Sequence, residues 1–387
     1  ASNSADISPD ILIIEMHRLA SSPNMIAIPL FTFAGVLMSS GGAPRRLVEF
    51  YRAAFGWMPG GLAIVTIGAC AFFTTFSGAS GVTILALGGL LYPILRGEGY
   101  KENFSLGLLT TSGSLGLLFP PSLAILIYGI VAGVSIEKMF FAGLVPGLLL
   151  ILMLAAYSMV QGNRSNVIRH KFELSTLLAT ARGSIWDLFL PVGIVTGIFG
   201  GFVSIMEAAA VTAAYVIIVE VYIYREIDLR TQFFGLLVET CVLFGSLLAI
   251  LLVALGLTNL MIDAQLPMKL LAAIEDHITS PIEFLLLLNL FLLLVGAMMD
   301  IFSAIIVVVP LILPLAARYG IDPIHLGVIF LANLEIGYST PPVGINLFIA
   351  SQRFGKTIVT LFKSTLPYLL IMLTWLLMIT YIPVLSL

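Results

Sequence analysis

The chain has 387 residues, of which 59% are apolar and only 10% are charged, and its formal net charge is −3. Soluble domains carry roughly 25% charged residues, so a soluble enzyme is excluded, and a nucleic-acid binder is excluded because no basic cluster could hold phosphates. A mean hydropathy of +1.10 indicates an integral membrane protein. Unbroken apolar runs such as 143–160 indicate a helical bundle, because the strands of membrane barrels alternate apolar and polar residues.

The first predicted elements are an apolar span at 24–40 and an amphipathic stretch at 43–58, which is typical of a helix lying in the membrane interface. Two apolar arms follow within 61–95 and are separated by Ser-Gly-Ala-Ser-Gly at 77–81. Each arm is shorter than the about 20 residues that cross a bilayer. The pattern therefore predicts a re-entrant helical hairpin. The chain starts at Ala1 rather than at Met and shows no signal peptide, so we expect that its true start is missing.

The apolar stretch 103–134 contains Pro120 and Pro121, and proline removes a backbone donor and clashes with the preceding helical turn. This predicts one span that is broken into two half-helices. Uninterrupted spans are predicted at 138–160, 184–203 and 206–224.

The order of elements then recurs at an offset of 221 to 223 residues. Residues 115–126 (LGLLFPPSLAIL) align with 336–347 (IGYSTPPVGINL), which places Pro341 and Pro342 on the first Pro-Pro pair. The amphipathic stretch falls on 267–278, and the hairpin tip falls on 298–303. Recurrence of several elements in order is strong evidence of an internal repeat.

Because three spans separate the two units, the second unit is predicted to be inverted. Only Arg18, Lys138, Lys269 and Arg318 then fall on one face, and the rest of the 18 Lys and Arg residues fall on the other. Basic residues concentrate on the cytoplasmic side of membrane proteins, so the second face is predicted to be cytoplasmic.

The predicted fold class is an all-α polytopic membrane protein with inverted repeats, each carrying a re-entrant hairpin and a Pro-Pro-broken transmembrane helix. The predicted organisation has four parts. These are a scaffold helix with an interfacial arm (1–60), a first transport-domain repeat (61–160, with its hairpin at 61–95, broken helix at 103–134 and helix at 138–160), scaffold helices with a second arm (161–281), and a second transport-domain repeat (282–387, with its hairpin at 282–317, broken helix at 324–353 and final helix at 366–387).

Inverted repeats with broken helices are typical of secondary transporters, because irregular backbone at mid-membrane depth is tolerated only where it lines a cavity. Small oxygen-bearing residues and glycines gather at the predicted breaks and tips, and hard cations such as Na⁺ take oxygen ligands. Close helix packing is the alternative role for such residues. The candidate sodium or substrate residues are Ser77, Gly78, Ser80, Gly81, Ser112, Ser114, Gly116, Asp300, Ser303, Gly337, Ser339, Thr340 and Asn346.

Two ionisable residues lie in apolar surroundings, where a charge costs several kcal/mol unless it is paired or hydrated. Asp300 lies at the second hairpin tip, where it could bind a cation or accept hydrogen bonds, and Glu335 is expected to accept hydrogen bonds from neighbouring backbone. No Lys or Arg lies in the predicted membrane core. An anionic substrate would therefore be neutralised by half-helix N-termini, hydroxyls, amides and bound Na⁺.

Several long segments resemble the large membrane subunit of tripartite ATP-independent periplasmic (TRAP) transporters. They are IPLFTFAGVLMSSGG (28–42), FPPSLAILIYGIVAGVSIEKMFFAGLVPGLL (119–149), MEAAAV (206–211) and STPPVGINLFIAS (339–351). The resemblance implies a multi-pass protein of the bacterial inner membrane that imports organic acid anions with Na⁺ as coupling ion and with no other cofactor. It also implies a soluble periplasmic substrate-binding protein and a small membrane subunit as partners, and an elevator motion of the hairpin-bearing repeats.

Two other classes remain as alternatives. An ion channel would share oxygen-lined sites. An intramembrane serine protease is suggested by Gly78-Ala79-Ser80-Gly81, with Ser80 as nucleophile, but it would need a histidine base, and His17, His170, His277 and His325 all fall near the predicted membrane edges.

Overall fold

The computed structural model describes residues 23–78, 80–165, 167, 171–263, 278 and 280–387. The N-terminal segment, the central residue of the first hairpin tip and nearly all of the predicted second arm (267–278) lie outside these ranges. Within them, six helices are long and apolar enough to cross a membrane, or eight if each of two bent helix pairs is one span. The predicted fold class is confirmed.

The chain first forms α2 (Pro23–Ser40) and α3 (Ala43–Phe55), which meet at an angle of 71°. Proline in the first turn of α3 suits a helix start, where the missing N–H costs nothing. Leu47 and Val48 of α3 are buried, whereas Arg45 and Glu49 are exposed. The amphipathic arm predicted from the sequence is therefore a helix that turns sharply away from the first span.

The first hairpin consists of α4 (Gly61–Ser77) and α5 (Ser80–Gly97), and the first broken helix consists of α6 (Glu102–Ser112) and α7 (Leu123–Ala132). Gly78 ends α4 with a left-handed φ of 63°, a conformation that glycine adopts without steric cost. The helical hydrogen bonds stop at the segment that carries Pro120 and Pro121, as the sequence predicts.

The long helix α8 (Ile136–Arg164) follows. A short helix, α9 (Leu174–Gly183), then meets α10 (Ile185–Phe199) at 70°, and α9 was not predicted. Helix α11 (Ile205–Ile217) begins at a capping box made by Ser204 and Glu207 and continues into a π-helical turn, η1 (Ile218–Ile223). Helix α12 (Phe233–Asp263) precedes the segment that is not described.

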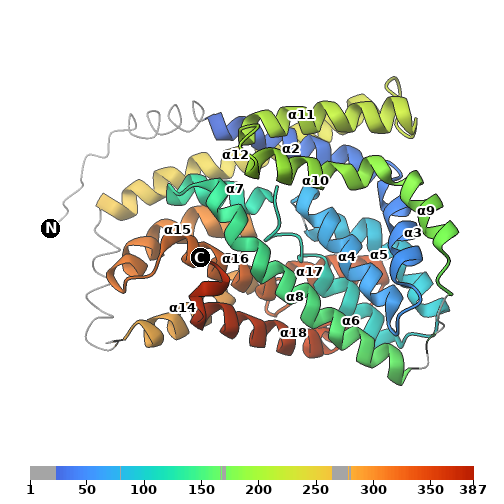
Figure 1. Cartoon of the computed structure of the whole chain (residues 1–387). Coiled ribbons are helices and arrows are strands. Elements are labelled where there is room, and N and C mark those ends of the chain that lie inside the picture. Colours follow the sequence, from blue (N-terminus) through green and yellow to red (C-terminus); the bar gives the residue numbers. More distant parts are fainter. Residues whose placement is uncertain (1–22, 79, 166, 168–170, 264–277, 279) are drawn as a thin grey trace.

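The second repeat follows the first at offsets of 220 to 222 residues when helix starts are compared. Its hairpin is α14 (Pro281–Met298) with α15 (Ile301–Arg318), and its broken helix is α16 (Pro323–Gly337) with α17 (Ile345–Phe354). Figure 1 shows the first hairpin and the second hairpin in opposite halves of the molecule, as an inverted repeat requires.

The final helix, α18 (Ile358–Tyr381), begins earlier than the predicted start at residue 366 and is followed by η2 (Pro383–Leu385). The side chain of Thr357 accepts a hydrogen bond from the backbone N–H of Thr360 at 3.3 Å, and this N-cap sets the true start.

The two repeats are interlocked. Each first half-helix packs against its own hairpin, with α6 on α4 and α5, and α16 on α14 and α15. Each second half-helix packs against the hairpin of the other repeat, with α7 on α15 and α17 on α5. The Tyr368 hydroxyl of α18 donates to the Phe104 carbonyl oxygen of α6 at 2.9 Å. The two hairpins and two broken helices therefore form one packed unit.

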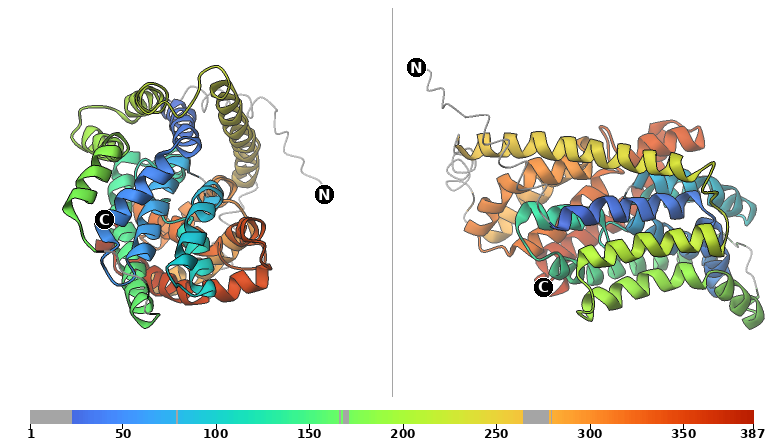
Figure 2. Two further views of the ribbon diagram at one scale, coloured as in Figure 1. Left: turned by 90° about the vertical axis from the view of Figure 1, so that its right-hand side faces the viewer. Right: turned by 90° about the horizontal axis from the view of Figure 1, so that it is seen from above.

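Helices α12, α2, α11 and α10 lie side by side in that order, as the right panel of Figure 2 shows, and each contacts the next.

A buried cluster of charged side chains joins the amphipathic helix α3 to this row of helices. Arg46 of α3 forms a bidentate ion pair with Asp187 of α10 at 2.7 and 2.9 Å, and it also reaches Glu220 of η1 at 2.7 Å. Arg46 reaches the neighbouring Glu226 at 2.7 Å as well. The arm is thus tied to two helices that are far from it in sequence.

Polar contacts at the two ends agree with the inverted topology. At one end, Lys356, which follows α17, pairs with Glu102 at 2.6 Å, and this hydrogen bond and the opposite charge raise the pKa of Lys356 and lower that of Glu102. At the other end, Lys138 and Asp322 line the same cavity. Lys356 and Lys138 are the two of these residues whose faces were predicted, and they were assigned to opposite faces.

Candidate functional site

The first helix break lies against the tip of its own hairpin. The Thr74 hydroxyl donates to the Gly113 carbonyl oxygen at 2.6 Å, and the Thr75 hydroxyl donates to the Gly116 carbonyl oxygen at 3.3 Å. A Cβ atom on Gly116 would lie 2.3 Å from the backbone nitrogen of Thr75. Only glycine permits this close approach, so Gly116 fixes the position of the break against α4.

The second break repeats this arrangement, with backbone groups in place of the threonine hydroxyls. A Cβ atom on Gly337 would lie 2.4 Å from the carbonyl carbon of Gly296 in α14. The backbone N–H groups of Val343 and Gly344 both donate to the Ala297 carbonyl oxygen at 3.1 Å. Gly116 and Gly337, which the sequence alignment paired, therefore occupy equivalent positions.

The second break also contacts the first repeat. The side-chain amide of Asn346, at the start of α17, donates to the Thr110 carbonyl oxygen of α6 at 3.2 Å, and Asn346 is fully buried. A Cβ atom on Gly81 would lie 2.5 Å from Cδ1 of Ile349. The candidate residues Gly81 and Asn346 are thus brought together with the elements of the opposite repeat.

Several buried side-chain oxygens beside the two breaks have no hydrogen-bond partner among the described residues. Because unpaired buried polar atoms are rare in folded proteins, each one calls for an explanation, and an unseen ion or water is among the usual ones. These atoms are Ser112 Oγ, Ser122 Oγ, Glu335 Oε1 and Oε2, Ser339 Oγ and Asn346 Oδ1.

Other candidate residues satisfy their polar groups locally. Ser114 donates to the Thr111 carbonyl oxygen at 3.3 Å, and Thr340 donates to the Ile336 carbonyl oxygen at 3.0 Å. Asp300 is the N-cap of α15, where its carboxylate accepts from the backbone N–H of Phe302 at 3.0 Å and from that of Ser303 at 3.1 Å, as well as from the Ser303 hydroxyl. Of the two roles predicted for Asp300, cation binding and hydrogen-bond acceptance, the structure shows hydrogen-bond acceptance.

Ser77 and Ser80 flank the tip of the first hairpin. Ser80 is buried, and Ser77 is half-buried and has an interaction partner. The protease alternative finds no support in the described part of the chain. His325, the one described histidine, contacts Ser386 Oγ at 2.5 Å and the Thr380 carbonyl oxygen at 3.2 Å, rather than Ser80.

A chain of buried polar side chains that the sequence did not predict links α16, α14 and α18. Asn333 donates to the Asn289 side chain at 2.7 Å, and Asn289 donates to the Thr380 hydroxyl at 3.1 Å. An asparagine in each of two facing apolar helices was the available signal. The expectation that Glu335 accepts hydrogen bonds from neighbouring backbone is wrong, because the N–H groups of α16 are used by the helix itself.

The donor set fits a hard monovalent cation better than a transition metal. Among the described residues, no group of three or more His, Cys, Asp and Glu side chains is placed to hold a metal ion. Hydroxyl, amide and backbone carbonyl oxygens are instead gathered at the breaks, and these are the ligands that hard cations prefer.

The two breaks differ in exposure. Pro120 and Pro121 of the first break are buried, whereas Pro341 and Pro342 of the second are exposed. A cavity of about 270 Å³ lies beside the first break, between α4 and α8 on one side and α3 and α10 on the other, and its lining includes Thr75 and Pro120.

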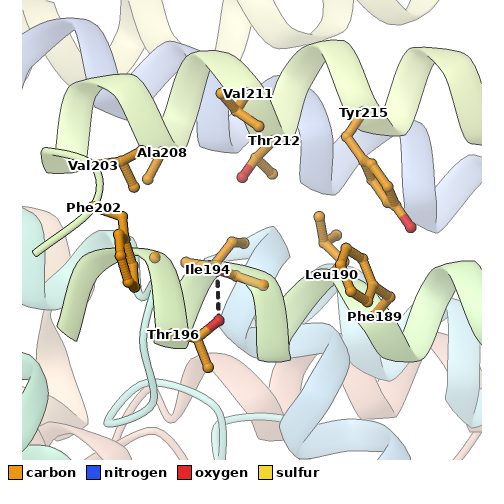
Figure 3. A pocket seen from close by; sticks show the side chains of 12 residues that line it. Phe189, Leu190, Ile194, Thr196, Phe202, Val203, Ala208, Val211, Thr212 and Tyr215 are labelled. Atoms are coloured by element: carbon orange, nitrogen blue, oxygen red, sulfur yellow. Dashed lines mark hydrogen bonds between the residues drawn. The ribbon is translucent and has the colours of Figure 1, made fainter. Parts of the chain in front are cut away.

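A second cavity, of about 330 Å³, lies between α10 and α11 and contains none of the candidate residues. Figure 3 shows its apolar lining, with Leu190 and Ile194 on α10 facing Ala208 and Thr212 on α11. Its place outside the interlocked repeats and its apolar lining separate it from the candidate site.

The fold and the site define a membrane transport protein built from inverted repeats. The family model described as "Tripartite ATP-independent periplasmic transporter, DctM component" matches residues 3–385, and the chain belongs to this family. It is a large permease subunit of a TRAP transporter rather than an enzyme, and it is a multi-pass protein of the inner membrane.

Known relatives are similar in sequence to nearly the whole chain. The C4-dicarboxylate TRAP transporter large permease protein DctM of Pseudomonas aeruginosa is 37% identical over 98% of this chain and 90% of its own length. The isethionate TRAP transporter permease protein DctMQ of Oleidesulfovibrio alaskensis is 36% identical over 93% of this chain, but the match spans 57% of that longer protein. The YdaH transporter of Alcanivorax borkumensis shares the fold, with a TM-score of 0.67 over 97% of this chain and 89% of its own, at 14% identity.

Proposed function

We propose that this permease imports an organic acid anion by coupling its movement to Na⁺, after a periplasmic substrate-binding protein has delivered the anion. The observation that carries the proposal recurs in both repeats: a hairpin tip packs on a helix break beside buried oxygens that have no hydrogen-bond partner among the residues described. Such oxygens are costly in an apolar interior unless a ligand satisfies them.

Sodium coupling is supported by the chemistry of these oxygens. Ser112 ends α6 and Ser339 follows the end of α16, so each hydroxyl lies at a half-helix C-terminus. The partial negative charge there favours small cations.

Anion binding is supported by the opposite ends of the same breaks. Helices α7 and α17 begin just after the breaks, at Leu123 and Ile345. Their N-termini therefore point backbone N–H groups toward the breaks, and such groups favour anions. The tips and breaks themselves contain no Lys or Arg. Relatives are named for C4-dicarboxylate, isethionate and sialic acid transport, which are organic acids.

Moving one charge across 100 mV is worth about 2.3 kcal/mol. Importing a monoanion into a negative interior opposes the field, so at least two Na⁺ ions per monoanion are needed for the potential to drive uptake.

We also propose an elevator motion, in which the two repeats (61–160 and 282–387) move as one body against a scaffold formed by the rest of the chain. The interlocked packing of the repeats supports a single moving body. The cavity beside Pro120 marks incomplete packing against α3 and α10, where sliding would occur. The difference in exposure between the two breaks is what one of two alternating-access states requires.

The proposed partners are the binding protein and a small TRAP membrane subunit. The family description names a tripartite transporter, and the longer relative DctMQ contains additional chain beyond the region that this permease matches.

Uptake into proteoliposomes tests the proposal. The purified permease, with the small subunit and a candidate binding protein, should accumulate the labelled anion only when the binding protein and an inward Na⁺ gradient are both present. Uptake that persists unchanged in choline buffer would refute sodium coupling. Current in the absence of the binding protein would instead support the channel alternative.

A further inference from the structure

Glu335 is an acid enclosed in the packed unit, with no partner in the part of the chain that the structure describes. It lies in α16, its exposed fraction is 0%, and neither carboxylate oxygen has a hydrogen-bond partner among the described residues. No described ion pair includes it either. A buried carboxylate with no donor and no counter-charge is strongly disfavoured.

Each of the other buried charged side chains of the described chain has at least one charged or hydrogen-bonding partner, although Glu220 Oε2 makes no hydrogen bond there. Arg46 pairs with Asp187 and Glu220, and Glu98 pairs with Arg52. His325 contacts Ser386 and a backbone carbonyl. Glu335 is therefore the exception among the described buried charges, and an ionisable residue inside a membrane segment is by default a functional-site hypothesis.

The position of Glu335 connects it with the second break. Residues four apart in a helix lie on the same face, one turn from each other. Ser339 follows Glu335 at this spacing, is fully buried, and also has a side-chain oxygen without a partner. Ser339 lies two residues beyond the end of α16, where the last turn tightens: the N–H of Tyr338 donates to the Leu334 carbonyl oxygen, four residues back, at 3.0 Å, and the N–H of Ser339 donates to the Ile336 carbonyl oxygen, three residues back, at 3.0 Å.

We infer that the Glu335 carboxylate is the negatively charged ligand of a coupling Na⁺ ion at the second break, with the Ser339 hydroxyl as its neighbour. This inference rests on the proposed sodium coupling and goes beyond it, because it assigns the counter-charge to one residue. Na⁺ is a hard cation that takes oxygen ligands, and it would satisfy three orphaned oxygens at once. Such a site would also leave no net charge in the apolar interior.

The Glu335→Gln variant tests the assignment, because glutamine keeps the shape and removes the charge. The first readout is the rise in melting temperature of the purified permease when NaCl replaces choline chloride at equal ionic strength, since a ligand that binds the folded state stabilises it. The second readout is the Na⁺ concentration for half-maximal uptake. Glu137→Gln, at an exposed position near the start of α8, is the matched control.

Wild type and the control should show equal Na⁺-dependent stabilisation. In Glu335→Gln, the Na⁺ concentration needed for either effect should rise by about tenfold or more, as expected when a charged ligand is lost. A Glu335→Gln protein that responds to Na⁺ as the wild type does would mean that the carboxyl is neutral, and the assignment would be overturned. Absence of any Na⁺ response in the wild type would instead refute the proposed function.

A second variant keeps the test decisive if Glu335→Gln does not yield folded protein. Glu335→Asp retains the charge but withdraws it by one methylene group, so it should shift the Na⁺ response several-fold while Li⁺, tested in parallel, is affected to a different extent. An unchanged response to both ions would overturn the assignment.

Discussion

Gly337 and Gly296 approach so closely that a Cβ atom on Gly337 would lie 2.4 Å from the carbonyl carbon of Gly296. The second hairpin therefore rests backbone to backbone on the second helix break. Gly116 and Thr75 make the equivalent contact in the first repeat, where the Cβ would lie 2.3 Å from a backbone nitrogen. In both repeats, the position of a hairpin tip is set by a glycine in the break.

Gly337→Ala should push the second hairpin away from the break, because backbone atoms cannot yield as a flexible side chain does. Overpacking of this kind typically costs about 1–3 kcal/mol, and we expect a lower melting temperature and a loss of most uptake. Gly97→Ala is the control, since no described atom beyond its own helical turn lies within 4 Å of the added Cβ and its φ is ordinary. Equal stability and uptake in the two variants would show that the contact is not needed.

Ser112→Ala and Ser339→Ala each remove one buried hydroxyl that has no partner in the described chain. If these hydroxyls bind Na⁺, each substitution should raise the Na⁺ concentration for half-maximal uptake several-fold. Because no described hydrogen bond is lost, the melting temperature in choline buffer should change little. Ser114→Ala is the comparison, since Ser114 already donates to a backbone carbonyl. A sodium dependence that stays the same in all three variants would remove both hydroxyls from the site.

Asp300→Ala should act through the start of α15. The carboxylate caps two backbone N–H groups, and loss of an N-cap costs about 1 kcal/mol. Asp300→Ser keeps a capping oxygen and removes the charge. If Asp300 also binds Na⁺, both variants should show a raised Na⁺ requirement in uptake. If it only caps the helix, Asp300→Ser should behave as wild type in thermal melts and in uptake.

Arg46→Ala should destabilise the scaffold strongly, because it leaves Asp187 and Glu220 buried without their counter-charge. Breaking a buried ion pair by removing one partner costs about 3–5 kcal/mol. Arg45 is 67% exposed at its side chain, and an exposed pair contributes little, so Arg45→Ala should melt close to wild type. A melting temperature for Arg46→Ala that equals that of Arg45→Ala would contradict the anchoring role of the cluster.

Much of the fold could be predicted because local signals mark it. The paired prolines at 120–121 and 341–342 forbid regular helix, and Ser-Gly-Ala-Ser-Gly at 77–81 interrupts an apolar run, so the breaks and the first hairpin follow from sequence. Helix α9, the π-helical turn and the start of α18 were missed, because each depends on a bend or a cap rather than on hydrophobic periodicity.

The candidate site could be predicted only in outline. The glycines and serines of the breaks were found from the repeat, and Gly116 and Gly337 do take equivalent positions. The exchange of half-helices between repeats depends on long-range packing, which spacing does not encode. For the same reason, the sequence could not reveal that the Asp300 carboxylate is used as a helix cap while Glu335 has no partner within the described ranges.

Direct binding of ²²Na⁺ to the purified permease tests the central claim, which is that the two helix breaks form sodium sites. The account predicts saturable binding to the wild type, competed by unlabelled Na⁺ and not by choline, and strongly weakened when Ser112→Ala and Ser339→Ala are combined. Absence of saturable binding in the folded wild-type protein, or undiminished binding in the double variant, would contradict it.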